Sequence, residues 1–206
     1  MVTLSEGQEL IQLARKAILK FLDKNEKINP PENVSPVLHE PSGVFCTLNT
    51  LSGGLRGCIG HPYPDSPLVN ALIDSAISAA TRDPRFPPVK LEEMKKLTID
   101  VTVLTPPKLL EVNHPKEYLE KIIIGKHGLI AEKGPRKGLL LPQVPISWNW
   151  DVEEFLAHTC QKAFLPMMAW TEKDTKIYIF EGQVFEEEKP DGSIVERSIM
   201  KNACEE

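Results

Sequence analysis

The feature that most constrains the fold is a pair of β-rich runs around a glycine-rich turn, between Gly43 and Gly60. The runs GVFCTLNT and LRGCIG flank the turn Ser52-Gly53-Gly54, a composition typical of a β-hairpin. With Gly53 and Gly54 as the two turn residues, Asn49 is predicted to pair with Cys58. A hairpin of this kind predicts an antiparallel sheet, one face of which must be covered by other elements.

Alternation along this hairpin sorts its side chains onto two faces. The apolar face is predicted to be core and carries Val44, Cys46, Leu48, Leu55 and Ile59. The mixed face carries Phe45, Thr47, Asn49, Arg56 and Cys58. The mixed face therefore brings a guanidinium and a thiol together, and a nearby cation lowers the pKa of a thiol.

This face supplies the first candidate site. Cys58 is predicted as the nucleophile or redox thiol, and Arg56 as the residue that lowers its pKa or binds an anionic substrate. Gly57 and Gly60 carry no side chains, so another molecule or another stretch of backbone can approach the strand closely. The alternative is structural: Cys58 is a small buried hydrophobe, and the glycines occupy bulge positions.

Helical periodicity and capping residues predict three long helices, over residues 5–23, 66–81 and 151–163. Ser5 with Gln8, Asp65 or Ser66, and Asp151 with Glu154 are the predicted caps. Strands are predicted over residues 98–105, 129–132, 139–141 and 176–187. Hairpin strands mixed with helices favour the α+β class over a doubly wound parallel sheet.

Composition narrows the class of protein further. With 206 residues, 41% of them hydrophobic and 26% charged, the chain is expected to be soluble and globular, with no membrane-spanning segment. The first residues, MVTLSEGQEL, do not resemble a secretory signal, so we expect a cytoplasmic protein whose four cysteines are reduced. The formal net charge of −5 argues against a nucleic-acid partner, because it would repel phosphates.

A second candidate site lies at the predicted end of the 66–81 helix. Arg82 and Arg85 surround an Asp83-Pro84 turn and are suited to hold a carboxylate or phosphate by forked hydrogen bonds. The alternative is a simple helix stop, in which Asp83 pairs with one of the arginines.

Other polar residues give weaker indications. His127, between Gly125 and Gly128, is a candidate general base or proton donor, or simply a solvated turn residue. Gln143 is suited to bind a ligand or to cap a loop. Cys58 and His61 have a C-x-x-H spacing, and the predicted pairing places Cys46 opposite His61. No closed set of ligands results, so neither a metal nor another cofactor is expected.

The three tryptophans are predicted to be core or lobe-interface residues: Trp148, Trp150 and Trp170. A role as stacking platforms for nucleic acid is disfavoured because no cluster of basic residues lies beside them.

Several segments, in this order, together resemble the AMMECR family, which is named for the Alport-syndrome, midface-hypoplasia and elliptocytosis chromosomal region. They are LRGCIG (55–60), DPRFPPV (83–89), the glycine-bounded run 125–130, GLLLPQV (138–144) and the stretch 153–163. The resemblance covers about residues 40–188. It is to the compact prokaryotic members that consist of this domain alone.

The resemblance implies one α+β domain over residues 1–206, with mainly antiparallel sheets and flanking helices. It also implies two lobes joined near residues 105–115, with the LRGCIG segment in a cleft between them. Arg56, Gly57, Cys58, Asp83, Arg85 and Gln143 match motif positions of the family. Between Gly125 and Gly128 the family tolerates other residues. The resemblance implies no known reaction, but it links some prokaryotic members to Memo-like and radical-SAM proteins.

Two functions therefore stay open. The first is an enzyme that uses Cys58 on a small anionic substrate, with Arg56 and His127 as its other catalytic residues. Its expected ligand-binding residues are Asn49, Gly57, His61, Arg82, Asp83, Arg85 and Gln143. The second is a non-catalytic binding or regulatory module that recognises a protein or small-molecule partner, in which Cys58 is only a packing residue.

Overall fold

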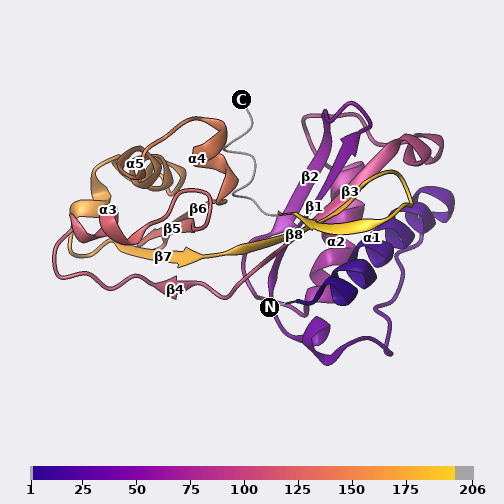
Figure 1. Cartoon of the computed structure of the whole chain (residues 1–206), viewed down its shortest axis with the longest axis horizontal. Coiled ribbons are helices and arrows are strands. Elements are labelled where there is room, and N and C mark those ends of the chain that lie inside the picture. The colour runs from indigo at the N-terminus through magenta and orange to yellow at the C-terminus, as the bar shows by residue number, and fades with distance from the viewer. Residues whose placement is uncertain (1, 198–206) are drawn as a thin grey trace. The chain divides into compact units, whose positions relative to one another are not determined.

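The computed structural model describes residues 2–197, which divide into two units (Figure 1). Unit 1 comprises the chain up to Leu104 together with Gln183–Arg197. Unit 2 comprises Thr105–Gly182. Each unit has its own sheet and its own apolar core, so each is described separately below.

Unit 1 is a five-stranded sheet with helices. Its elements are α1 (Leu4–Lys24), η1 (Pro36–His39), β1 (Gly43–Thr50), β2 (Leu55–His61), α2 (Leu68–Thr81), η2 (Leu91–Lys96), β3 (Leu97–Leu104), β8 (Gly182–Glu187) and β9 (Ile194–Arg197). The strands follow the order β2-β1-β3-β8-β9. β1 lies antiparallel to both β2 and β3, and β9 lies antiparallel to β8, so the hairpin predicted from the sequence forms part of this sheet.

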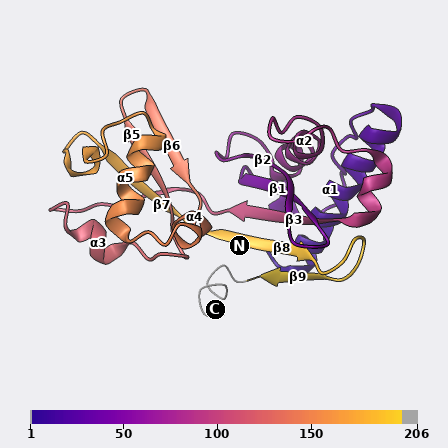
Figure 2. The ribbon, with the colours of Figure 1, turned by 90° about the horizontal axis from the view of Figure 1, so that it is seen from above.

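The core of unit 1 lies between this sheet and its two long helices. α1 and α2 cover the same face of the sheet, as Figure 2 shows. Their apolar side chains pack on the inward residues of the strands, among them Leu10, Ile18, Leu72, Val44, Cys46, Leu48, Ile99 and Val101. The opposite face of the sheet is therefore the one on which polar side chains can gather.

Both predicted helix starts in unit 1 are wrong by a few residues. The capping box of α1 is formed by Thr3 and Glu6, two residues before the predicted Ser5 cap. The same spacing occurs at both places, and the Glu6 carboxylate is the stronger acceptor for a backbone N–H. α2 follows Pro67 without any side-chain cap, so neither Asp65 nor Ser66 has the predicted role.

A buried ion pair joins three parts of unit 1. Arg15 of α1 donates through Nε to Glu187 Oε1 at 2.7 Å, and its Nη2 donates to the other carboxylate oxygen. The same guanidinium donates to the carbonyls of Met94 and Leu97, and Glu187 Oε2 accepts the N–H of Ile99 at 3.0 Å. Both side chains are at least nine-tenths buried, so α1, β3 and β8 are tied together where water is excluded.

Unit 2 is a four-stranded antiparallel sheet with one longer helix. Its elements are β4 (Lys108–Leu109), α3 (Glu117–Lys121), β5 (Gly128–Lys133), β6 (Arg136–Leu140), α4 (Gln143–Ser147), α5 (Val152–Lys162), η3 (Ala169–Thr171) and β7 (Lys176–Phe180). The strand order is β4-β7-β5-β6. α5 begins at the predicted capping box of Asp151 and Glu154, and packs on this sheet through Phe155, Leu156 and Cys160.

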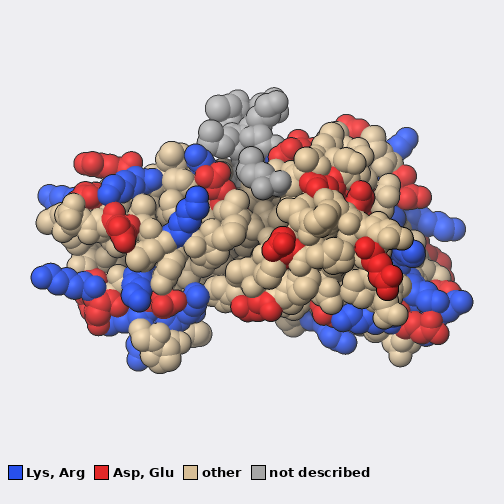
Figure 3. All heavy atoms as spheres, turned by 90° about the horizontal axis from the view of Figure 1, so that it is seen from below, with Lys and Arg blue, Asp and Glu red and all other residues tan. Residues whose placement is uncertain are grey.

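The predicted single strand over residues 176–187 is in fact two strands. β7 ends at Phe180, β8 begins at Gly182, and the two belong to different sheets. The α+β class and the antiparallel sheets are confirmed. Within residues 2–197, no helix is long and apolar enough to cross a lipid bilayer. On the face drawn in Figure 3, basic and acidic side chains are interspersed on both units.

Candidate functional site

The register of the β1–β2 hairpin differs from the predicted one. Cys58 pairs with Thr47 rather than with Asn49, and Asn49 pairs with Leu55. The register shifts at this point, which leaves Arg56 as the extra residue of a β-bulge. A bulge redirects the side chains on one side of it, so strict alternation fails for the first residues of β2.

The predicted assignment of hairpin side chains to the two faces of the sheet is correct only for residues beyond the bulge. Val44, Cys46 and Leu48 are fully buried, as predicted, and Ile59 packs against the same core. Leu55 is 40% exposed instead of being a core residue, because the bulge moves it to the other side of the strand.

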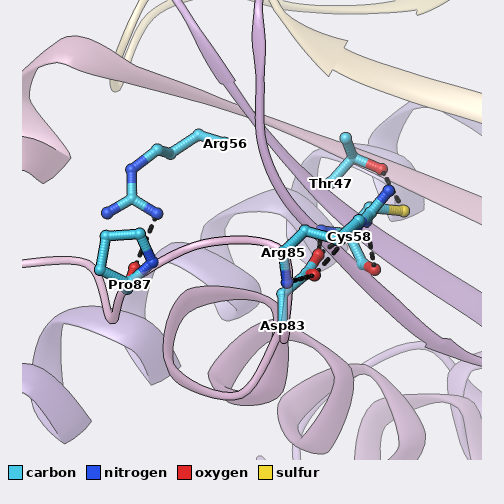
Figure 4. A network of polar contacts seen from close by, with 6 residues as sticks. All are labelled: Thr47, Arg56, Cys58, Asp83, Arg85 and Pro87. Carbon is cyan, nitrogen blue, oxygen red and sulfur yellow. Dashed lines mark hydrogen bonds and ion pairs between the residues drawn. The ribbon is translucent and has the colours of Figure 1, made fainter.

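The guanidinium of Arg56 is directed away from the thiol of Cys58. Its Nε donates to Glu93 Oε2 at 3.1 Å, and its Nη1 donates to the carbonyl of Pro87 at 3.0 Å. Figure 4 shows its guanidinium directed toward Pro87, whereas the thiol of Cys58 lies beside Thr47. The predicted Arg56–Cys58 pair is therefore wrong, and the bulge at Arg56 is the physical reason.

Asp83 and Arg85 hold the backbone of Cys58 instead. Asp83 Oδ2 accepts the N–H of Cys58 at 2.8 Å, and Arg85 Nη2 donates to the Cys58 carbonyl at 3.4 Å. Arg85 also donates to both carboxylate oxygens of Asp83, at 2.9 and 2.7 Å. β2 is an edge strand, so this ion pair satisfies groups that a neighbouring strand would otherwise satisfy. The Arg85 guanidinium holds the pKa of Asp83 well below its usual range.

The side chain of Cys58 has its own partner on the sheet. Thr47 Oγ1 donates to Cys58 Sγ at 3.2 Å. Burial raises the pKa of the Cys58 thiol, while the Thr47 hydrogen bond and the charge of Arg85 lower it. The direction of the shift is opposite to the predicted one, because desolvation opposes the thiolate more than these two groups favour it.

Asp100 adds a carboxylate beside Thr47 on the neighbouring strand. It was not singled out in the sequence analysis. It lies directly across from Thr47 on β3, and its Oδ2 accepts a hydrogen bond from Asn49 Nδ2 at 2.9 Å. Burial raises its pKa to about 6, against the effect of Arg197. Its signal was a carboxylate in the middle of an otherwise apolar and threonine-rich strand, TIDVTVLT.

Cys58, Thr47 and Asp100 thus form a row across β2, β1 and β3, which we call the thiol row. Its side chains lie on the face of the sheet opposite to α1 and α2, because Cys46 and Leu48, the neighbours of Thr47, face those helices. The row combines a nucleophilic atom, a hydroxyl that donates to it, and a carboxylate whose pKa burial raises to about 6.

Gly57 has a structural reason to be glycine. A Cβ atom there would lie 2.2 Å from the backbone carbonyl oxygen of Ala79 in α2. Replacing Gly57 with Ala is therefore expected to lower the free energy of unfolding by about 2 kcal/mol, because backbone must shift to remove the overlap.

Urea denaturation followed by far-UV circular dichroism measures this effect, with Gly54→Ala as the matched control. A Cβ at Gly54 meets only the Thr50 hydroxyl, at 3.1 Å, so that change is expected to cost less than about 1 kcal/mol. Equal losses from the two variants would contradict close approach as the reason for Gly57.

The other predicted residues of unit 1 have separate neighbours. His61 Nδ1 lies 2.9 Å from Ser75 Oγ, and His61 pairs with Val44 rather than with Cys46. Arg82 is the exposed C-cap of α2 and directly precedes Asp83. No group of three or more His, Cys, Asp or Glu side chains within residues 2–197 is placed to hold a metal ion.

His127 and Gln143 belong to unit 2. His127 is only 7% exposed, so it is not a solvated turn residue, and its Nδ1 accepts the N–H of Ile123 at 3.1 Å. Burial and the charge of Lys126 lower the pKa of this ring. Gln143 is the first residue of α4, and its Oε1 atom is buried without a hydrogen-bond partner among the described residues.

Comparison with known proteins identifies relatives that match this chain over most of its length. The AMMECR1 family model matches residues 11–185. The protein MK0488 of Methanopyrus kandleri is 54% identical over 204 residues, which cover 97% of each chain. The protein MJ0810 of Methanocaldococcus jannaschii is 52% identical over 201 residues, 97% of this chain and 99% of that one.

A solved structure agrees with this placement. The crystal structure of the uncharacterised protein PH0010 of Pyrococcus horikoshii is 51% identical, with a TM-score of 0.86, and the match covers 96% of this chain and 98% of that one. The names of these relatives state no activity. The resemblance seen in the motifs is confirmed: the chain belongs to the AMMECR1 family.

Proposed function

We propose that this protein is a thiol-dependent enzyme that acts on a small anionic substrate at the thiol row. The observation that carries the proposal is the row itself, in which Thr47 donates to the sulfur of Cys58 and Asp100 lies directly across the sheet. A nucleophile, a group that orients it and a titratable base are the components of covalent catalysis by cysteine.

Asp100 takes the role of general base in this proposal. Because burial raises the pKa of the thiol, Cys58 is protonated in the resting protein. The pKa of Asp100, about 6, leaves this carboxylate ionised at neutral pH yet more basic than an ordinary aspartate. As sulfur bonds to an electrophilic carbon of the substrate, the thiol proton passes through water to Asp100, whose backbone lies about 10 Å from that of Cys58 across the sheet. Thr47 donates to the sulfur and does not carry this proton.

The preference for an anion rests on the residues that follow α2. Arg85 is half exposed, donates to the carbonyl of Cys58 and lowers the pKa of its thiol by its charge, and exposed Arg82 lies three residues before it in the chain. Arg56 is not part of the proposal because it is paired with Glu93. His127 is not part of it because its Nδ1 already accepts a backbone hydrogen bond.

Alkylation of Cys58 by iodoacetamide tests the assignment of the base. In the reaction, sulfur bonds to the carbon of the reagent, iodide leaves, and the thiol proton is transferred. If Asp100 accepts that proton, the rate is expected to rise as the pH passes about 6, well below the ordinary thiol pKa of about 8.5. Replacing Asp100 with Asn is then expected to slow the reaction at neutral pH by about tenfold or more.

The alternative, a binding module without catalysis, predicts the opposite sign. An ionised Asp100 raises the pKa of Cys58, so without general-base action Asp100→Asn would leave alkylation unchanged or make it faster. Peptide mapping by mass spectrometry separates Cys58 from buried Cys46 and Cys160, and from Cys204, which lies outside the described residues. Asp74→Asn, which changes a half-exposed carboxylate of the same unit, is the matched control.

A further inference from the structure

A small group of charged side chains lies on the polar face of the unit 1 sheet, at the end of the thiol row. Its members are Asp100 from β3, Glu186 from β8 and Arg197 from β9. β8 lies between β3 and β9 in the sheet (Figure 2). The group therefore adjoins the carboxylate that serves as the base in the proposed function.

Alternation along the strands places all three side chains on this face. Glu187 of β8 faces the helices, because it forms the buried ion pair with α1, so its neighbour Glu186 projects to the opposite side. Arg197 pairs with Val184, which lies two residues before Glu186, so Arg197 projects to the same side as Glu186. Asp100 is on this side as a member of the thiol row.

The guanidinium of Arg197 is shared unequally between the two carboxylates. Its Nε lies 2.5 Å from Glu186 Oε2, which makes a close ion pair. Its Nη2 lies 3.8 Å from Asp100 Oδ2, which is too far for a hydrogen bond. The same Asp100 oxygen accepts a hydrogen bond from the neutral amide of Asn49. Glu186 thus holds the cation, while the hydrogen-bond partner of Asp100 is uncharged.

The position of Arg197 affects how readily Asp100 accepts a proton. A guanidinium that forms forked hydrogen bonds with a carboxylate favours its ionised form, so a carboxylate bound in this way is a poor base. Burial and the charges of Glu186 and Glu187 raise the pKa of Asp100, and Arg197 lowers it without cancelling them. Glu187 is paired with Arg15 on the other face, so its contribution does not depend on what Arg197 contacts.

From this geometry we propose that Glu186 and Arg197 are positioning residues of the same site. Glu186 holds the guanidinium beyond hydrogen-bond distance of Asp100, which keeps Asp100 basic enough to accept the proton of a thiol. This inference rests on the proposed function, but its central contact is measurable on Asp100 itself. The side chains of Glu186 and Arg197 are 28% and 34% exposed, so each can be replaced without opening the core.

The alternative is a structural role, in which Arg197 only ties the edge strand β9 to the sheet. Loss of either partner would then loosen β9 and admit water to Asp100, so its pKa would fall in both variants toward about 3.9. The proposed role predicts opposite directions. Glu186→Gln removes a negative charge and releases Arg197 to Asp100, so the pKa of Asp100 falls. Arg197→Gln removes a positive charge, so the pKa of Asp100 rises.

An NMR titration of the Asp100 carboxyl group in the full chain measures these directions. The protein is isotope-labelled at the aspartate carboxyl carbons, and the Asp100 signal is assigned by its absence in Asp100→Asn. We expect the titration midpoint to fall by at least about 0.5 pH unit in Glu186→Gln and to rise by at least about 0.5 pH unit in Arg197→Gln.

Glu196→Gln is the matched control for the loss of a negative charge. Glu196 is an exposed carboxylate of β9 that directly precedes Arg197, and it pairs with the core residue Phe185, so it projects to the other face. Its replacement is expected to move the Asp100 midpoint by less than about 0.2 pH unit.

Alkylation of Cys58 separates this inference from the proposed function. If Asp100 is the base, the onset of iodoacetamide alkylation should move with the carboxyl midpoint, and the rate at neutral pH should fall about twofold to threefold in Glu186→Gln. Midpoints that move in the expected opposite directions with unchanged alkylation would support the role of Glu186 and Arg197 and overturn that of Asp100 as base. Any other pattern of midpoints, including a fall in both variants, would overturn the inference whatever alkylation shows.

Discussion

Replacing Glu187 with Gln is expected to lower the free energy of unfolding of unit 1 by about 3 to 5 kcal/mol. Among residues 2–197, Glu187 has the only carboxylate that pairs with the buried guanidinium of Arg15, and the change removes it. Arg15 keeps its bonds to the carbonyls of Met94 and Leu97, but carbonyl dipoles do not neutralise a buried charge. Urea denaturation followed by far-UV circular dichroism is the suitable measurement, because all three tryptophans lie in unit 2.

Two further variants separate the buried charge from a general effect of losing an ion pair. Glu26→Gln breaks an exposed pair with Lys20 and should cost less than about 1 kcal/mol. The double variant Arg15→Met with Glu187→Leu removes both charges and should regain at least about 2 kcal/mol relative to Glu187→Gln. If Glu187→Gln costs no more than Glu26→Gln, the ion pair does not hold α1, β3 and β8 together.

Local pattern was sufficient to predict the class of the fold but not the register of its hairpin. The glycine-rich turn and the apolar runs predicted antiparallel strands, and Val44, Cys46 and Leu48 were assigned to the correct face. A bulge adds one residue without any distinctive composition, so Arg56 and Leu55 were both misplaced. What fixes the bulge is tertiary: Glu93 and the Pro87 carbonyl hold the guanidinium of Arg56.

The candidate site, too, could be predicted from the sequence only in part. Asp83 and Arg85 were predictable as a pair from their spacing, but their hold on the backbone of Cys58 depends on where α2 ends relative to β2. Asp100 could have been noticed as a carboxylate in an apolar strand. Its position across from Thr47 required the order of β2, β1 and β3, which a single sequence does not specify.

Replacing Asp83 with Ala is expected to lower the free energy of unfolding by about 3 to 4 kcal/mol at neutral pH, because two backbone N–H groups lose a charged acceptor. These are the N–H groups of Cys58, at 2.8 Å, and of Arg85, at 3.1 Å. Asp83 is 4% exposed, so water does not replace the carboxylate freely. The measurement is urea denaturation by circular dichroism, with Asp74→Asn as a half-exposed control expected to cost less than about 1 kcal/mol.

The pH dependence of the Asp83→Ala effect tests independently whether the ionised form of Asp83 is the stabilising one. Arg85 holds the pKa of Asp83 below the unfolded value of about 3.9, so the stabilisation is complete above that pH. It is lost as the pH falls further, toward the pKa in the folded state. The difference between wild type and Asp83→Ala should therefore be constant from neutral pH down to about pH 5 and shrink below about pH 4. A constant difference down to about pH 2.5 would contradict the role of the ionised carboxylate.

Arg85→Ala separates the two interactions of Asp83, which are its ion pair with Arg85 and its hydrogen bonds from backbone N–H groups. The Arg85 side chain is 53% exposed, and its removal leaves Asp83 with both backbone N–H donors. We expect a loss of about 1 to 2 kcal/mol, about half that of Asp83→Ala. If the order were reversed, the ion pair rather than the carboxylate–backbone bonds would hold the edge strand. In that case the position of Cys58 would depend on Arg85. An anionic substrate that binds Arg85 would then displace the thiol with which it has to react.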